Sequence, residues 1–181
     1  MPRYIAFLRA VNVGGRIVKM DELRREFAAL GFANVETFIA SGNVIFETKA
    51  ADTEKLAQKI ETHLAQWLGY AVETMIRSVA ELEAVANYQP FSAADIAAAQ
   101  AFHVVFLATV PPADTPEKLQ AVSTPVDDFH LHGRELYWLC RAKFNESQVK
   151  PAQLDKALSK VPGTARSITT VKKLVAKYGG K

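Results

Sequence analysis

The sequence predicts an α+β fold made of two ferredoxin-like lobes, each of the β-α-β-β-α-β type with an antiparallel sheet. Two observations indicate this class. In the first half, apolar patterns typical of strands and helices follow one another in the order β-α-β-β-α-β. In the second half, the order β-α-β-β-α begins again after a proline-containing connection. At 181 residues, the chain is long enough to bury a core in each of two small lobes.

The elements expected in the first lobe follow from hydrophobic periodicity and turn residues. Residues 3–8 are apolar at odd and even positions alike, which predicts a central strand covered on both faces. Gly31 and Gly69 are suited to end the two helices, and Asp52 or Thr53 to cap the second one. In order, we expect a strand at residues 3–8, a helix at 20–30, a hairpin of strands at 35–40 and 44–46, a helix at 56–68 and a strand at 72–76.

The second lobe repeats this pattern after a connection that starts near residue 88. Ser78 and Glu81 form a capping box for a short helix before the connection. Pro116 and Pro151 each suit the first turn of a helix, and Gly133 suits a hairpin turn. In order, we expect a strand at 103–108, a helix at 115–122, strands at 126–131 and 135–141, a helix from 151 and a helix at 170–178. The predicted domains are therefore residues 1–88 and residues 89–181, the second with basic terminal helices.

The composition favours a protein of the cytoplasm. No apolar stretch approaches the roughly 20 residues that a membrane span needs, and residues 1–20 lack the apolar core of a signal peptide. The single cysteine, Cys140, excludes an internal disulfide, and its apolar neighbours indicate an inert thiol inside a strand. We expect no membrane association, no cofactor and no metal ion, and nothing in the sequence indicates an oligomeric state.

Charge is unevenly distributed along the chain. Residues 141–181 contain ten basic and two acidic side chains, whereas residues 1–140 contain 12 basic and 17 acidic ones. A basic segment can attract nucleic acid or another phosphate-rich partner, or it can be the solvated face of terminal helices. Against nucleic acid, no aromatic stacking platform is evident, because the aromatic residues of the expected strands suit the core equally well. Both interpretations stay open.

Three polar clusters interrupt the apolar patterns, each at the end of an expected element. The first surrounds Gly14 and Gly15 after the first strand, the second is the hairpin turn at residues 41–43, and the third precedes the last helix. Glycine pairs, hydroxyl groups and arginines can hold a phosphate or carboxylate, although turns and helix caps also use such residues. The candidate ligand-binding residues are Arg9, Asn12, Gly14, Gly15, Ser41, Asn43, Thr164, Arg166 and Thr170.

No catalytic motif is recognisable. The sequence lacks G-x-S-x-G, C-x-x-C and H-E-x-x-H, and the glycine loop has neither the P-loop spacing nor that of G-x-G-x-x-G. His130 and His132 share one strand face, which can begin a metal site, but no third ligand follows at a clear spacing. Whether the protein is an enzyme stays open.

Several segments of the chain resemble one bacterial family. They are LRAVNVGG at residues 8–15, Met20, Leu23, Gly31-Phe32, Thr37 and SGNVIF at residues 41–46. In these residues the chain is similar to the proteins grouped as domain of unknown function 1697, and residues 164–171 resemble the closing motif of that family. Ala10 stands where the family commonly has Gly, and Ser167-Ile168 where it commonly has Asn-Trp. The resemblance implies a two-lobed α+β fold and no assigned activity.

Three functional hypotheses follow. The working hypothesis is that the candidate residues converge on one polar crevice that binds a phosphate- or carboxylate-bearing ligand. The alternatives are nucleic-acid binding through the basic C-terminal region and a non-catalytic protein interaction module with an exposed apolar patch. The partners to consider are thus an anionic small molecule, nucleic acid and another protein.

Overall fold

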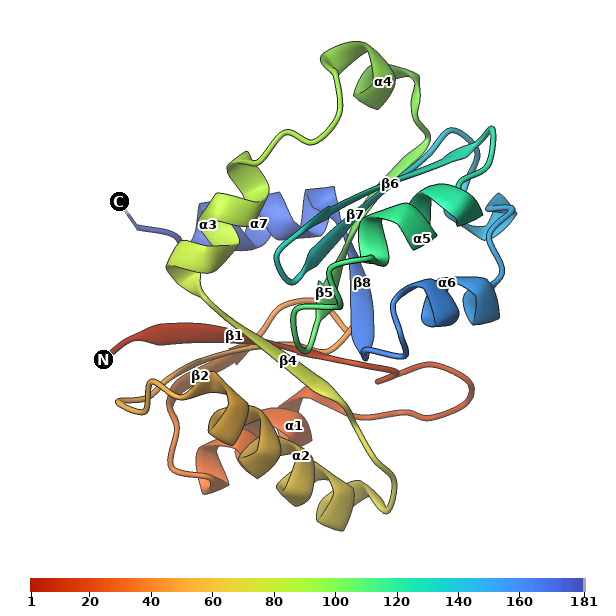
Figure 1. The fold of residues 1–181 in the computed structure, drawn as a ribbon. Coiled ribbons are helices and arrows are strands. Elements are labelled where there is room, and N and C mark those ends of the chain that lie inside the picture. Colours follow the sequence, from red (N-terminus) through yellow and green to blue (C-terminus); the bar gives the residue numbers. More distant parts are fainter. Residues whose placement is uncertain (181) are drawn as a thin grey trace. The chain divides into compact units, whose positions relative to one another are not determined.

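The computed structural model describes residues 1–180, which form two compact units. One unit contains residues 1–83 together with the chain from Leu174 onward, and the other contains Ala84–Lys173. Each unit is built on its own four-stranded antiparallel sheet with flanking helices (Figure 1). The two expected ferredoxin-like lobes are thereby confirmed, whereas the division into domains at residue 88 stays a prediction.

The sheet of the first unit has the strand order β2-β3-β1-β4. Its interior strand β1 (Arg3–Leu8) pairs with β3 (Asn43–Glu47) on one side and β4 (Thr74–Ser78) on the other, and β2 (Ala33–Thr37) is an edge strand. Residues 4–8 are all buried. The apolar pattern on both faces of this strand therefore predicted its central place correctly.

Helices α1 (Met20–Ala29) and α2 (Thr53–Leu68) cover one face of this sheet, where their apolar side chains join alternate residues of β1 in a single core (Figure 1). Helix α2 has both predicted caps. The Asp52 carboxylate accepts a hydrogen bond from the Lys55 amide at 3.1 Å, and Gly69 ends the helix at a φ of 80°.

The second unit repeats the same topology with the strand order β6-β7-β5-β8. The strands are β5 (Ala101–Leu107), β6 (Asp127–His132), β7 (Glu135–Cys140) and β8 (Gly163–Ser167). Helices α5 (Thr115–Val122) and α6 (Pro151–Ala157) pack over one core with this sheet. Two shorter elements complete the unit, the helix α4 (Ala93–Ala98) and the 3-10 turn η1 (Phe144–Glu146).

Strand β8 completes the β-α-β-β-α-β order of the second lobe, but the sequence pattern did not place a strand at residues 163–167. The prediction placed Thr164, Arg166 and Thr170 in a loop and first turn before the last helix, but residues 163–167 pair antiparallel with β5. Gly-Thr-Ala-Arg-Ser contains one β-branched residue, Thr164, and no aromatic residue, so its local signal for a strand is weak. Pairing with β5 rather than local propensity makes this segment extended, so only Thr170 lies in the first turn of the helix that follows.

The last strand of each sheet leads directly into a helix. These are α3 (Val79–Asn87) after β4 and α7 (Ile168–Tyr178) after β8. A serine precedes each helix and caps it in the same way. Ser78 Oγ accepts a hydrogen bond from the Glu81 amide, and Ser167 Oγ accepts one from the Thr170 amide, both at 3.2 Å. The capping box of Ser78 and Glu81 is confirmed, because Glu81 Oε2 also accepts from the Ser78 amide at 2.7 Å.

Within residues 1–180, no helix combines the length and apolar character needed to cross a membrane.

Candidate functional site

Two loops of the first unit lie together and form the candidate site, which we name the loop pair. One is residues 9–19 between β1 and α1, and the other is residues 38–42 between β2 and β3. Asn12 connects them, because its Nδ2 donates to the carbonyl of Ala40 at 2.8 Å. Its Oδ1 accepts from the Val18 amide at 2.6 Å, which closes the first loop on itself. One amide side chain therefore holds the shape of both loops.

The backbone of the loop pair is unusually rich in left-handed conformations. Positive φ angles occur at Ala10 (59°), Asn12 (59°), Gly14 (60°), Gly15 (82°), Ile39 (53°) and Gly42 (84°). Such angles are costly for a β-branched residue such as Ile39. At Gly42 the absence of a side chain is also a packing requirement, since an added Cβ would lie 3.1 Å from Leu8 Cβ and 3.3 Å from the Leu8 carbonyl oxygen.

The first loop presents backbone amides that have no acceptor. Among the described residues, no group accepts a hydrogen bond from the amides of Val13, Gly14, Gly15 or Ile17, and these residues are exposed. The Arg16 amide differs, because it donates to the Val13 carbonyl at 3.1 Å. Consecutive free amides in a loop with left-handed residues can form a concave anion-binding nest.

Two exposed arginines flank these amides. Arg9 Nη1 lies 2.8 Å from Glu73 Oε2, and both side chains are more than two-fifths exposed, so the ion pair is weak and open to competition by another anion. The Arg16 guanidinium lies 4.1 Å from the centre of the Tyr70 ring, and this cation–π contact uses none of its N–H groups as hydrogen-bond donors. The loop pair thus combines free amides with two positive charges.

The hairpin turn has a mainly structural role. Asn43 is fully buried, and its Nδ2 donates to the Phe38 carbonyl at 2.8 Å and to Ser41 Oγ at 2.9 Å. These bonds shape the turn that carries Gly42 against Leu8. Ser41 and Asn43 therefore lie beside the first loop, as the hypothesis of a shared site requires, but their described bonds explain them without a ligand.

The remaining candidate residues belong to the second unit. Arg166 in β8 is 7% exposed, and its Nη1 donates to Thr164 Oγ1 at 2.8 Å and to the Ala165 carbonyl at 2.9 Å. Burial lowers the pKa of Arg166 to about 10, so the guanidinium is still protonated at neutral pH. Thr170 lies in the first turn of α7, where its hydroxyl is 3.0 Å from Ser167 Oγ. Their convergence with the loop pair on one crevice stays a prediction.

A second cluster in the second unit was missed in the sequence. Tyr88 Oη lies 2.7 Å from His130 Nε2, and the Tyr88 ring stacks on His132 with 4.1 Å between ring centres. Burial and the neighbouring His132 lower the pKa of His130. The histidine pair was visible as an alternation along one strand, but Tyr88 is 42 residues away and carries no local signal. Within residues 1–180, no three His, Cys, Asp or Glu side chains are grouped to hold a metal ion.

The buried carboxylate of Asp127 organises the segment that follows β7. It accepts hydrogen bonds from Trp138 Nε1 at 2.9 Å, Ser147 Oγ at 2.7 Å and the Gln148 amide at 3.0 Å. Cys140 lies opposite Asp127 in the sheet and is also fully buried, and burial raises the pKa of its thiol. The predicted place of this cysteine inside a strand is confirmed, and its inertness stays a prediction, which burial supports because a buried protonated thiol is a poor nucleophile.

Comparison with family profiles shows to which protein family the chain belongs. The family described as "Protein of unknown function (DUF1697)" matches residues 1–137. The chain belongs to this family. A solved structure, that of the conserved bacterial protein SP0830 from Streptococcus pneumoniae, is similar, with a TM-score of 0.77, 25% sequence identity and coverage of 99% of each chain. A comparison with curated protein sequences finds no match.

Most of the candidate ligand-binding residues lie in the part of the chain that the DUF1697 family matches. The whole loop pair lies inside the matched residues 1–137, as does the Tyr88–His130 contact. Thr164, Arg166 and Thr170 lie beyond them. The resemblance seen in the first 46 residues of the sequence is therefore confirmed at the level of the family.

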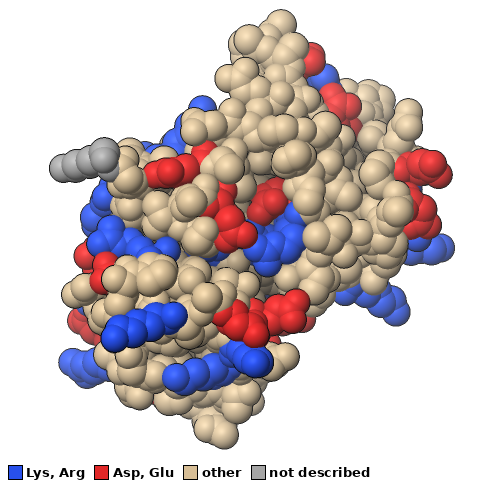
Figure 2. Space-filling model, turned by 60° about the vertical axis from the view of Figure 1, so that its left-hand side comes forward, with Lys and Arg blue, Asp and Glu red and all other residues tan. Residues whose placement is uncertain are grey.

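Three basic residues of the C-terminal region of this DUF1697 protein are paired with a carboxylate or buried. Arg141 Nη1 lies 2.7 Å from Asp128 Oδ2, Lys177 Nζ lies 3.6 Å from Glu36 Oε2, and Arg166 is buried. On the face drawn in Figure 2, Lys and Arg side chains alternate with Asp and Glu side chains. The basic region includes Lys181, which lies outside the described residues.

Proposed function

We propose that this DUF1697 protein binds a phosphate- or carboxylate-bearing small molecule at the loop pair. The free amides of the first loop would donate to the anion, and the guanidinium groups of Arg9 and Arg16 would add charge-assisted hydrogen bonds. The single observation that carries the proposal is that the amides of four exposed residues of the first loop have no acceptor among the described residues, namely those of Val13, Gly14, Gly15 and Ile17.

Two further features support the proposal. The loop is already held in shape by Asn12, so a ligand would not have to order it, and a preorganised donor set binds more tightly than a mobile one. Gly14 and Gly15 allow close approach, because nothing lies within 4 Å of the position that a Cβ would take at either residue.

The larger crevice is the finer form of this proposal. In it, Ser41 and Asn43 border the anion, and Thr164, Arg166 and Thr170 complete the site. We expect the protein to act in the cytoplasm, where its lone buried thiol at Cys140 would stay reduced.

The test is calorimetric titration of the full chain with inorganic phosphate, pyrophosphate and citrate. A charge-assisted hydrogen bond contributes roughly 1.5–3 kcal/mol, so Arg16→Ala should weaken binding about tenfold or more. Arg25→Ala is the matched control, because Arg25 is an exposed arginine of the same unit outside the loop pair. Equal affinities for the two variants would contradict the proposal.

The same titrations, extended to short oligonucleotides, separate the alternatives. Binding of oligonucleotides alone, with affinity that falls steeply with salt and does not respond to Arg16→Ala, would favour nucleic-acid binding through the basic C-terminal region. If none of the tested anions binds, a protein interaction module would be favoured. Its apolar patch would then consist of the exposed side chains of the loop pair, Val13, Ile17 and Ile39.

A further inference from the structure

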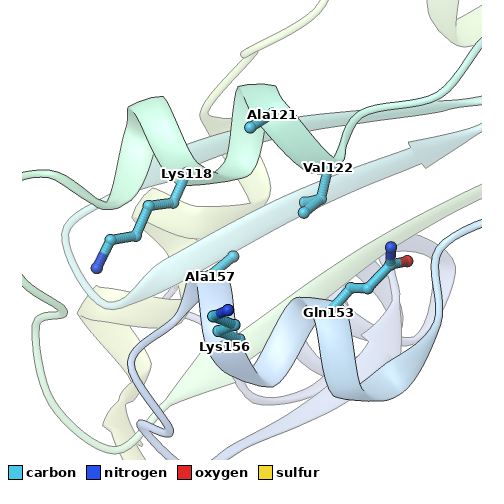
Figure 3. Close-up of a pocket in the computed structure, with 6 residues that line it drawn as sticks. All are labelled: Lys118, Ala121, Val122, Gln153, Lys156 and Ala157. Carbon is cyan, nitrogen blue, oxygen red and sulfur yellow. The ribbon is translucent and has the colours of Figure 1, made fainter.

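A groove of about 280 Å³ lies between α5 and α6 in the second unit (Figure 3). It is independent of the loop pair, which belongs to the first unit. Each helix contributes three side chains to its lining. These are Lys118, Ala121 and Val122 from α5, and Gln153, Lys156 and Ala157 from α6.

The inner part of the groove is apolar and rests on the core. Ala157 is 4% exposed and belongs to the core cluster of this unit, and Val122 packs against the same cluster. Ala121 adds a methyl group from the neighbouring turn of α5 (Figure 3). Because these side chains are small, the two helices leave a channel between them that an aliphatic chain could fill.

The charge at the groove has one sign. The lining contains two lysines and no carboxylate. Lys118 has a half-exposed ion pair with Asp114 at 3.1 Å, whereas the side-chain amino group of Lys156 has no hydrogen-bond or ion-pair partner among the described residues. In Figure 3, the Lys118 side chain extends from α5 toward one end of the groove, and the Lys156 side chain is seen end-on against α6.

We propose that this groove binds a short fatty-acid carboxylate. The aliphatic chain would lie on Ala121, Val122 and Ala157, and the carboxylate would pair with the Lys156 amino group, with Lys118 as a second cation. The volume corresponds to roughly nine water molecules at about 30 Å³ each, which suits a chain of about eight carbons. An apolar channel with a few polar groups at its end is the usual form of a small-molecule site.

The test uses sodium octanoate and the full chain, followed through the methyl resonances of Val122 in NMR spectra. The proposal expects saturable shifts of Val122 at millimolar octanoate, weaker binding of 1-octanol and no binding of octylammonium. Equal affinity for octanoate and 1-octanol would overturn the assignment of a carboxylate, and absence of any Val122 shift with octanoate would overturn the site itself.

Two variants test where the carboxylate and the aliphatic chain of the ligand bind. Lys156→Gln should weaken octanoate about two- to fivefold, the range expected for one exposed ion pair, and leave 1-octanol unchanged. Lys172→Gln is the matched control, since Lys172 is an exposed lysine of α7 outside the groove. Ala121→Trp fills the channel from an exposed position and should abolish binding while the protein stays folded. Octanoate affinity that survives Ala121→Trp would place the ligand elsewhere and overturn the proposal.

Discussion

Arg77 and Arg166 occupy matching positions in the two sheets. Arg77 in β4 lies opposite Ile5 of the interior strand β1, and Arg166 in β8 lies opposite Val104 of the interior strand β5. Each donates from Nη1 to the carbonyl of the residue before it at 2.9 Å, and each is followed by the serine that caps the next helix. A buried arginine with the same local bonds in both lobes indicates a structural role for Arg166.

This match predicts a loss of stability in Arg166→Ala that does not depend on any ligand. The variant leaves Thr164 Oγ1 without the donor that it has in the wild type, and we expect the free energy of unfolding to fall by about 1–3 kcal/mol. Urea unfolding at neutral pH measures the change, with Lys172→Ala as an exposed control. An unchanged midpoint together with lost anion binding would instead make Arg166 a ligand residue.

Gly42→Ala should destabilise the protein more than Gly69→Ala. Both glycines have nearly the same positive φ, 84° and 80°, so the backbone strain of an alanine is matched. Only at Gly42 would the new Cβ meet other atoms, those of Leu8 and Val11 at 3.1–3.3 Å. We expect the extra crowding to cost about 1–3 kcal/mol in chemical unfolding. Equal costs would show that the hairpin turn shifts freely away from β1.

Asn12→Ala should loosen the first loop without unfolding the protein. It removes both the donor to Ala40 and the acceptor for Val18. Amide hydrogen exchange at Val18 and Arg16, whose amides are hydrogen-bonded within the loop, should then accelerate. Affinity for anions at the loop pair should fall, since binding must now order the loop. Exchange rates like those of the wild type would mean that the loop keeps its shape without this side chain.

Asp127→Asn should lower the free energy of unfolding by about 1–3 kcal/mol at pH 7, and the difference should narrow at acid pH. Burial raises the pKa of Asp127, but hydrogen bonds from Thr124, Ser147 and Trp138 outweigh it and hold the pKa below its ordinary value. A carboxyl with a lowered folded pKa stabilises above its unfolded pKa of about 3.9, and this contribution is lost as the pH falls through the folded value.

Urea unfolding of wild type and variant from pH 7 to pH 3 measures this narrowing. Asp155→Asn is the control, because Asp155 is exposed. A difference between wild type and Asp127→Asn that stays constant down to pH 3 would contradict the role given to the ionised carboxylate.

Cys140 should resist thiol reagents in the folded protein and react at the normal rate in urea. The thiol is buried, and the raised pKa of the thiol keeps it protonated at neutral pH. Labelling followed by mass spectrometry with and without denaturant gives the two rates, and rapid labelling of the native protein would contradict the inert assignment.

Much of the fold could be predicted because its central strands and amphipathic helices carry strong periodic signals. The apolar residues of β1 and the caps of α2 are examples in which local sequence and tertiary position agree. Strand β8 could not be predicted, because residues 163–167 are extended only through pairing with β5.

The candidate site could likewise be predicted only in part. Gly14 and Gly15 indicate a loop with left-handed backbone conformations, and in the structure this loop lies beside the hairpin turn. That the Asn12 side chain ties both loops together could not be inferred, because the acceptor is a backbone carbonyl 28 residues away. The burial of Arg166 was hidden for the same reason, since it depends on neighbours distant in the sequence.

The way in which Asn12 closes the first loop also has a kinetic consequence. A loop that is already shaped before a ligand arrives needs no slow rearrangement on binding, so the observed association rate should rise linearly with ligand concentration. Opposite charge on ligand and arginines would speed the encounter, and added salt would slow association more than dissociation. The rate of association would then be limited by the encounter of ligand and protein and not by a change in the shape of the loop.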